Sequence, residues 1–274
     1  MTAPPDLPTS SSGTSAIDVA WMCARAAGDL ALSRFRGVHQ IDVKGHRNIV
    51  TNTDVEAELR VKEVLAAEFP DHKILSEETA YDTDASSGWT WVIDPIDGTK
   101  NYAIGIPFWC TNVALCHDGE PVVGLTYDAV HGEGFWAVEG EGAYCNEERI
   151  RVSDNADVFS SVISLDLGYD DALGSRQLEL VQRIFPNVQG IRITGSAALG
   201  LAYAACGRID LYAHLTVSPW DVAAGILLVR EAGGIATERD GSPMTIMTSQ
   251  FVAGGPAVHA DFMARYAKAQ GGQM

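Results

Sequence analysis

The spacing of apolar residues predicts two opening helices followed by a run of strands. Apolar residues recur at helical spacing from 17 to 35, and Gly37 follows as a stop. A second helical stretch opens with a Thr-x-x-Glu capping-box pattern at 53–56 and runs toward Phe69. The period then shortens, which predicts strands at 73–76, 89–93, 111–117, 121–128 and 134–138. We expect these strands to form a largely antiparallel meander packed on the opening helices.

The rest of the chain alternates between strands and helices. Strands are expected at 161–166, 191–194, 210–214, 234–237 and 251–253. Helices are expected at 175–185, 195–207, 219–232 and 257–269. The fold class is therefore mixed α+β. We expect a tail without fixed structure over 1–15, an α+β half over 16–154 and an α/β half over 155–274. The halves join near 152–157 and share an interface.

Composition indicates a globular protein with a strong negative charge. The chain has 274 residues, of which 46% are hydrophobic, enough to bury a sizeable core. The 36 Asp and Glu against 19 Lys and Arg give a formal charge of −17. This balance argues against binding nucleic acid or an anionic membrane through bulk electrostatics. An anionic ligand would need something local to reverse the field.

Neither the N-terminus nor the cysteines indicate export. Residues 1–15 are rich in Pro, Ser and Thr and lack the basic and apolar regions of a signal peptide. The uncharged run at 193–207 is too short to span a bilayer. Five cysteines are scattered without a Cys-x-x-Cys pair, which favours reduced thiols. We expect a cytoplasmic protein that does not contact a membrane.

The sharpest local feature is the sequence Trp-Val-Ile-Asp-Pro-Ile-Asp-Gly-Thr at 91–99. An apolar strand runs directly into two carboxylates, Asp94 and Asp97, with the Ile96 carbonyl between them as a further oxygen donor. Hard oxygen donors without nearby Cys or His favour Mg²⁺ over zinc or copper. An Asx turn at a strand exit would give the same isolated pattern, so this motif alone leaves both interpretations open.

Further carboxylates follow other predicted elements. Glu77 and Glu78 come directly after a short apolar strand. Asp54 lies in the first turn of the second helix, just after Thr51, and Asp221 opens an apolar helix. An acidic residue at a helix start also stabilises the helix dipole, which is a structural explanation for Asp54 and Asp221 taken singly. Together these positions are where an α/β protein would build a metal site.

This combination resembles the inositol monophosphatase family, which are Mg²⁺-dependent, Li⁺-sensitive phosphomonoesterases. The residues that carry the resemblance are Lys44, 50–54, 76–78, 94–99, 220–225 and 231–234, with the linking segment 140–153. Their order and spacing match from about residue 17 to 262. The resemblance implies a layered αβαβα sandwich of the sugar-phosphatase type, in which the two halves form one catalytic unit, and a homodimer.

The resemblance also implies roles for individual residues. Two or three Mg²⁺ ions would be held by Glu77, Asp94, the Ile96 carbonyl, Asp97 and Asp221. Thr99, hydrogen-bonded toward Asp54, would activate the attacking water together with Glu77, without a covalent phosphoenzyme. The N–H groups of Gly98 and Thr99 would cradle the phosphate. Supporting roles fall to Lys44, Thr51 and Glu78.

The substrate is less sharply indicated. The resemblance implies that the leaving alcohol contacts Asp97, Gly195, Ser196, Ala197 and His214. The known inositol phosphatases carry a carboxylate where this chain has His214, and often an Asp where it has Asn48. We expect a small polyol phosphate, first of all inositol 1-phosphate. Histidinol phosphate, fructose 1,6-bisphosphate and 3′-phosphoadenosine 5′-phosphate remain alternatives.

Other chemistries lack their signatures. Asp94 and Asp97 do not have the Asp-x-Asp-x-Thr spacing of aspartyl-nucleophile phosphatases, and Cys206 lies only two residues from Arg208, too close for a cysteine phosphatase. No His-Glu-x-x-His, Walker A or Gly-x-Ser-x-Gly motif occurs. An alternative of another class is a non-catalytic, acidic interaction protein on the same fold. No nucleic-acid partner is expected.

Overall fold

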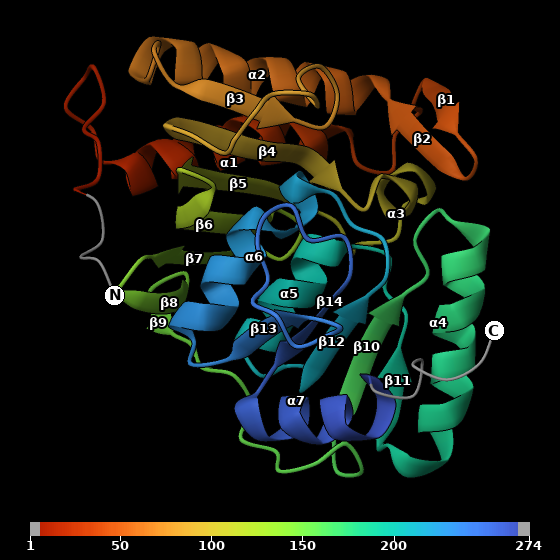
Figure 1. The fold of residues 1–274 in the computed structure, drawn as a ribbon. Helices are drawn as coiled ribbons and strands as arrows, with labels where there is room; N and C mark the ends of the chain where they lie inside the picture. The colour runs from red at the N-terminus through yellow and green to blue at the C-terminus, as the bar shows by residue number, and fades with distance from the viewer. Residues whose placement is uncertain (1–5, 268–274) are drawn as a thin grey trace.

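The computed structural model describes residues 6–267 and has five layers (Figure 1). One outer layer consists of α1 (Ala16–Arg34) and α2 (Asn52–Glu68), which cover a seven-stranded sheet. The central layer holds α5 (Ala197–Ala205) and α6 (Pro219–Glu231), and a five-stranded sheet follows. The last layer consists of α4 (Asp171–Ile184) and α7 (Pro256–Phe262). The expected αβαβα sandwich is confirmed.

The seven-stranded sheet contains the five strands of the predicted meander, and its last two strands, β8 and β9, were not predicted. Its strands run in the order β3-β4-β5-β6-β7-β8-β9, and every neighbouring pair is antiparallel except β3 and β4, which are parallel. The bounds are β3 Lys73–Ser76, β4 Trp89–Asp97, β5 Cys110–His117, β6 Glu120–Asp128, β7 Glu133–Val138, β8 Gly142–Cys145 and β9 Glu148–Arg149. The parallel pair brings the carboxyl ends of β3 and β4 to the same edge, together with the acidic residues that follow them.

The five-stranded sheet has the order β11-β10-β12-β14-β13. Its bounds are β10 Val162–Asp166, β11 Gly190–Arg192, β12 Leu211–His214, β13 Ile235–Glu238 and β14 Phe251–Gly254. Strand β10 runs parallel to both β11 and β12, whereas β14 pairs antiparallel with β12 and β13. Asp166 and His214 face each other in the register of β10 and β12, so both strands end at one place.

The central helices bury nearly all of their side chains because both faces meet a sheet. Every residue of α6 from Val222 to Val229 is buried, as are eight of the nine residues of α5. The two helices approach so closely that a Cβ on Gly225 would lie 2.6 Å from the Leu201 Cβ. Burial on both faces explains why these helices read as continuous apolar runs rather than amphipathic ones.

The Gly225→Ala variant is expected to lose about 1–3 kcal/mol of unfolding free energy, because the added methyl overpacks the contact between α5 and α6. Chemical denaturation would measure the loss. Gly45→Ala is the matched control, since a Cβ there meets nothing within 4 Å. Equal stability of the two variants would contradict this account of the central layer.

Several elements differ from the sequence-based expectation. The hairpin of β1 (Ile41–Gly45) and β2 (Asn48–Thr51) was not predicted; residues 41–44 alternate apolar and polar side chains, but β1 is exposed along its whole length. The six-residue helix α3 (Thr99–Ile104) was also not predicted as an element. The closing helix was expected at 257–269, but α7 ends at Phe262 and a π-helical turn, Met263–Ala267, follows; positions 268 and 269 lie outside the described residues.

Two local predictions near the N-terminus are wrong. The capping box of α2 is formed by Thr51 and Asp54, not by residues 53 and 56. Residues 9–15 were expected to lack fixed structure, yet they form a turn closed by a bridge between Thr9 and Ser15. Ser11 N–H donates to the Glu68 carbonyl at 2.8 Å, which ties this turn to the end of α2. Residues 1–5 lie outside the described part of the chain.

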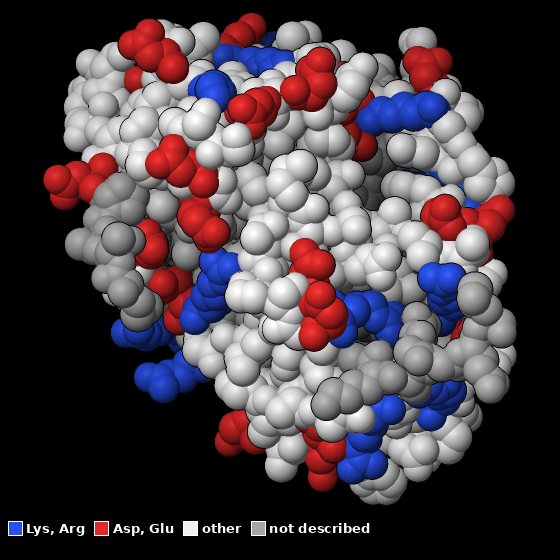
Figure 2. Space-filling view, in the orientation of Figure 1, with Lys and Arg blue, Asp and Glu red and all other residues white. Residues whose placement is uncertain are grey.

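On the face in Figure 2, acidic side chains are scattered among uncharged ones rather than gathered together. Within residues 6–267, no helix combines the length and apolarity that crossing a membrane requires. A separate group of acidic side chains lines a cavity.

Candidate active site

A cavity of about 350 Å³ is lined by strand ends from both sheets. Its wall includes the end of β4, the start of α3, the loops after β10 and β12, and the first turn of α6. Twelve residues singled out from the sequence line it: Asn48, Glu77, Asp94, Ile96, Asp97, Gly98, Thr99, Gly195, Ser196, Ala197, His214 and Asp221. The four other predicted residues are Lys44, Thr51, Asp54 and Glu78, and none of them lines the cavity. Lys44 contacts Glu77 and Asp54 contacts Thr99, both of which line it. Glu78 and Thr51 contact Lys44 and Asp54 in turn.

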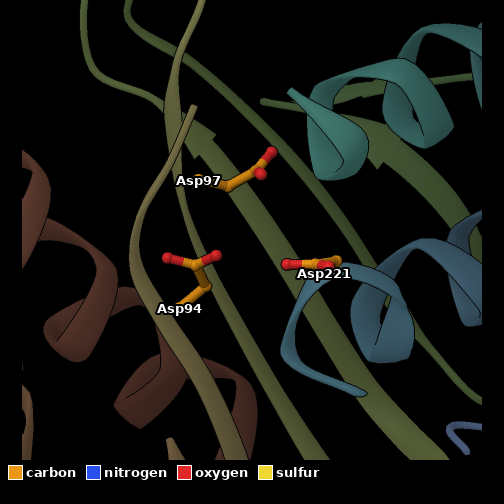
Figure 3. Close-up of side chains that lie close together, drawn as sticks. All are labelled: Asp94, Asp97 and Asp221. Atoms are coloured by element: carbon orange, nitrogen blue, oxygen red, sulfur yellow. The ribbon is translucent and has the colours of Figure 1, made fainter. Parts of the chain in front are cut away.

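Three carboxylates form the centre of this cavity. One oxygen atom from each of Asp94, Asp97 and Asp221 lies within 4.8 Å of the others (Figure 3). Asp94 and Asp97 come from β4, and Asp221 from the first turn of α6, on the opposite side (Figure 3). Segments more than 120 positions apart thus converge on one point, as the grouping of acidic strand exits and helix starts predicts.

Each of these carboxylates is fixed by the backbone. Asp94 Oδ1 accepts the Ile96 N–H at 3.0 Å, and Asp221 Oδ2 accepts the Ser218 N–H at 2.7 Å. Asp97 Oδ2 accepts the Ala198 N–H at 2.8 Å and the Ser196 hydroxyl. A β-bulge between Asp94 and Asp97 lets both carboxylates of one strand face the cavity.

The electrostatics of the cluster fit a divalent cation. Burial raises the pKa of Asp94 and Asp221 well above the ordinary carboxyl value, and nearby negative charges raise both further. Burial likewise raises the pKa of Asp97, to about 6. Buried like charges at this spacing are costly unless a cation neutralises them. An all-oxygen donor set is what Mg²⁺ prefers.

Glu77 lies at the edge of this cluster rather than within it. Among the described residues it is not part of the three-carboxylate group, although it lines the same cavity and its charge raises the pKa of Asp94. Lys44 Nζ lies 2.9 Å from Glu77 Oε1 and 2.6 Å from Glu78 Oε1, so the β1–β2 hairpin holds both glutamates. Buried Glu58 accepts the Glu78 N–H at 2.8 Å and fixes the same loop from α2.

Thr99 and Asp54 form a hydrogen-bonded pair next to the cluster. Thr99 Oγ1 lies 3.1 Å from Asp54 Oδ1 and 3.0 Å from the Ile96 carbonyl. Asp54 Oδ2 accepts the Thr51 N–H at 2.9 Å and the Thr51 hydroxyl at 2.5 Å, which fixes its orientation. Burial raises the pKa of Asp54 to about 6. Because the Thr99 proton is directed to these acceptors, its oxygen can accept a hydrogen bond from a water in the cavity.

Replacing Thr99 by valine is expected to lower kcat about 10²-fold with little change in KM, because the variant keeps the shape but cannot orient a water. Steady-state kinetics would measure both constants. Thr90→Val is the matched control, since Thr90 lies on β4 and its buried hydroxyl has no hydrogen-bond partner within residues 6–267. A Thr99→Val variant with the kcat of the Thr90→Val control would refute the role of the hydroxyl.

Asp166 is a candidate site residue that the sequence analysis did not select. It ends β10, is 5% exposed, and its Oδ1 accepts the N–H groups of Thr194 at 2.9 Å and Gly195 at 2.7 Å. Its Oδ2 accepts the Tyr212 hydroxyl at 2.7 Å. Asp166 therefore positions the segment that carries the predicted substrate contacts. Its place at the carboxyl end of a parallel strand is the signal that could have identified it.

His214 is neutral and has a defined tautomer. Its Nδ1 accepts the Thr216 N–H at 2.9 Å, so the ring proton must reside on Nε2. Burial lowers the pKa of His214 to about 4. In the cavity His214 is therefore a hydrogen-bond donor without charge, where the resembling inositol phosphatases carry a carboxylate.

Comparisons with known proteins agree with this geometry. The model of the inositol monophosphatase family matches residues 14–271. A tomato (Solanum lycopersicum) protein named inositol monophosphatase 2 is 36% identical over 247 residues, covering 86% of this chain and 92% of its own. The Nus factor SuhB of Escherichia coli K12 is 34% identical, covering 88% and 92%.

Solved structures give the same result. The IMPase of Thermotoga maritima superposes with a TM-score of 0.83 at 33% identity, covering 90% of this chain and 94% of its own. The extragenic suppressor protein suhB of Bartonella henselae superposes with a TM-score of 0.85 at 32% identity, covering 92% and 98%. Both similarities extend over nearly the whole chain.

Proposed function

Because the chain belongs to the inositol monophosphatase family, as its sequence motifs predict, we propose that it is a Mg²⁺-dependent phosphomonoesterase. Its substrate is a small phosphorylated polyol, with inositol 1-phosphate as the first candidate. The observation that carries the proposal is the meeting of the carboxylates Asp94, Asp97 and Asp221 in one cavity with the pair formed by Thr99 and Asp54.

The metal would be held by oxygen donors at the ends of β3 and β4 and the start of α6. These donors are Glu77, Asp94, the Ile96 carbonyl, Asp97 and Asp221. Bound Mg²⁺, two or three ions per site, supplies charge neutralisation for the phosphate and a lowered pKa for water. The fit rests on the buried, mutually repelling carboxylates, which a divalent cation would stabilise.

The chain's own groups then orient the reactants. Thr99 Oγ1 accepts a hydrogen bond from the attacking water while Asp54 fixes the hydroxyl, and Glu77, which lines the same cavity, shares this role. The N–H groups of Gly98 and Thr99 at the start of α3 face the phosphate. On the leaving-group side, Asp97, residues 195–197 and His214 contact the alcohol.

A substrate panel tests the proposal. Release of phosphate would be measured with inositol 1-phosphate, histidinol phosphate, fructose 1,6-bisphosphate and 3′-phosphoadenosine 5′-phosphate, in Mg²⁺, in Mg²⁺ with Li⁺, and in chelator. We expect Mg²⁺-dependent hydrolysis of at least one ester and inhibition by Li⁺. Inactivity on all four would contradict the proposal.

A second candidate is a non-catalytic role, which the relatives named Nus factor SuhB favour. It predicts that the carboxylate cluster is dispensable. The test is whether an Asp97→Asn variant restores the phenotype of cells that lack the protein. Restoration, together with no heat of Mg²⁺ binding in calorimetry, would favour this role over catalysis. Failure to restore the phenotype together with loss of Mg²⁺ binding would favour the phosphatase.

A homodimer, a cytoplasmic location and the absence of a nucleic-acid partner remain predictions. Size-exclusion chromatography with light scattering would test the first. Titration with RNA and DNA at 50 and 200 mM salt would test the last, since a charge-driven complex weakens steeply over this range.

A further inference from the structure

Two cations lie on the wall of the cavity together with the carboxylate cluster. Lys100 comes from the first turn of α3, and Arg47 from the turn between β1 and β2. Lys100 is half-buried, and its Nζ lies 4.4 Å from the centre of the Tyr169 ring, which lines the same cavity. In a chain with 19 basic and 36 acidic residues, two cations in one cavity call for an explanation.

Lys100 has an aromatic neighbour but no anionic one. Among residues 6–267, no carboxylate lies within 4.0 Å of its Nζ, whereas Lys44 and Lys62 each have one at 3.0 Å or less. Burial lowers the pKa of Lys100, and the positive charge of Arg47 lowers it further. A half-buried ammonium over an aromatic ring is arranged to receive an anion.

Arg47 is held where it can share that anion. Its Nη2 lies 2.7 Å from Asp171 Oδ1 at the start of α4, and it also donates to the Tyr169 carbonyl at 3.4 Å. Asp171 is 73% exposed, so this ion pair lies in water and neutralises Arg47 only weakly. The contact fixes the tip of the hairpin against residues 169–171, which carry the aromatic ring under Lys100.

Two carboxylates, Asp97 and Asp166, lie on the leaving-group side of the cavity, and each already accepts hydrogen bonds from the chain's own groups. His214, which stands where the resembling inositol phosphatases have a carboxylate, is neutral and presents a donor. Asp166 is occupied by two N–H groups and a hydroxyl. A neutral polyol needs neither of the two cations, and the scissile phosphate is served by the metal side of the cavity.

We propose that the preferred substrates carry a second anionic group on the leaving alcohol, a phosphate or a carboxylate, which Lys100 and Arg47 bind over Tyr169. This inference rests on the proposed phosphatase function and narrows its substrate class, placing charged esters ahead of inositol 1-phosphate, which carries no second anionic group. It implies that an ester of a neutral polyol is bound more weakly than the same ester bearing an additional charge.

Matched ester pairs test the inference. Fructose 1-phosphate and fructose 1,6-bisphosphate differ by one phosphate, and glycerol 2-phosphate and 2-phosphoglycerate differ by one carboxylate. Initial rates of phosphate release in Mg²⁺ give kcat and KM for each. We expect the charged member of at least one pair to have a kcat/KM about tenfold higher, mainly through KM, as a charge-assisted contact would give. The pair that shows the preference identifies phosphate or carboxylate.

Variants separate this role from support of the scissile phosphate. In Lys100→Met and Arg47→Met the preference is expected to fall to about twofold or less, while the kcat for the neutral esters is unchanged. Lys100→Arg should retain the preference. Arg60→Met, which removes one exposed positive charge on α2, is the control for net charge and should behave as wild type.

Two results would overturn the inference. One is equal kcat/KM for both members of both pairs in the wild type. The other is an equal loss on neutral and charged esters in Lys100→Met, which would assign the lysine to the scissile phosphate. If none of the esters is hydrolysed, the phosphatase proposal fails, and calorimetric titration with the same four compounds in Mg²⁺ still decides whether the charged members bind more tightly through Lys100.

Discussion

Replacing Asp94 by asparagine is expected to lower kcat/KM by about 10³-fold or more and, at the same time, to make the metal-free protein more stable. Asp94 is 1% exposed and lies within 4.8 Å of two other carboxylates. Asparagine keeps the Oδ1 that accepts the Ile96 N–H but removes the charge. Loss of a metal ligand removes several kcal/mol of transition-state stabilisation.

The gain in stability follows from the same geometry. Burial and the charges of Glu77, Asp97 and Asp221 all raise the pKa of Asp94, so its ionised form is unfavourable when no cation is present. Removing that charge is expected to raise the melting temperature in chelator at pH 8 by several degrees, corresponding to about 1–2 kcal/mol. Addition of Mg²⁺ should stabilise the wild type but not the variant.

The measurements are steady-state kinetics and thermal unfolding in chelator and in Mg²⁺. Asp71→Asn is the matched control, because Asp71 is exposed in the loop before β3, at the end of the strand opposite Glu77. It should leave the activity and the Mg²⁺ effect unchanged. An Asp94→Asn variant that keeps more than a tenth of the activity, or that Mg²⁺ still stabilises, would refute the assignment of Asp94 as a ligand.

The centre of the site could be predicted from sequence because its signals are local. The apolar run before Asp94 fixes a buried strand, and the residues at 94–99 place carboxylates, a carbonyl and a hydroxyl within six positions. The apolar run after Asp221 fixes a helix whose first turn carries an acid. Each signal depends only on neighbouring residues, so no tertiary information is required to read it.

The cavity wall was harder to predict because it depends on contacts between distant segments. Arg47 contacts Asp171 across more than 120 positions, from the turn of a hairpin whose first strand is exposed along its whole length. Asp166 becomes a site residue only through the parallel pairing of β10 with β12, which brings it beside His214. Residues 9–15 are joined to α2 by a backbone hydrogen bond from Ser11 N–H to the Glu68 carbonyl, which composition does not encode. In these cases the structure depends on which distant segments contact each other rather than on local propensity.

The metal-free protein is expected to lose stability as the pH rises from about 5 to 8.5, and Mg²⁺ is expected to abolish this loss. Burial raises the pKa of Glu78 to about 7, and that of Asp94 and Asp221 well above the ordinary carboxyl value. The folded state therefore keeps protons that the unfolded chain has already released. Stability falls as the pH rises through these folded-state values, because deprotonation places negative charges close to one another where burial limits their hydration.

Below about pH 6.5 the buried histidines act in the opposite direction. Burial lowers the pKa of His214 to about 4 and also lowers the pKa of His72 and His259. Here the unfolded chain binds protons that the folded state does not, which adds a contribution that rises with pH until the histidines of the unfolded chain are neutral. It reduces the loss of stability without reversing it, because the carboxyls with a raised pKa, which include Asp54 and Asp97 at about 6, outnumber these three histidines.

Magnesium abolishes the loss of stability with rising pH because its ligands must be ionised to bind it. At a concentration about 100 times its dissociation constant, Mg²⁺ adds about 2.7 kcal/mol, which is about 5–10 °C for a chain of this size. The Mg²⁺-induced shift in melting temperature should therefore be small at pH 5.5 and reach this value at pH 8.

Thermal unfolding at fixed ionic strength, in chelator and in Mg²⁺ from pH 5 to 8.5, measures both curves, with Asp94→Asn as the variant that should lack the shift. A shift independent of pH would mean that the buried carboxylates are already ionised at pH 5.5, and a flat curve in chelator above pH 6.5 would mean that they do not repel one another.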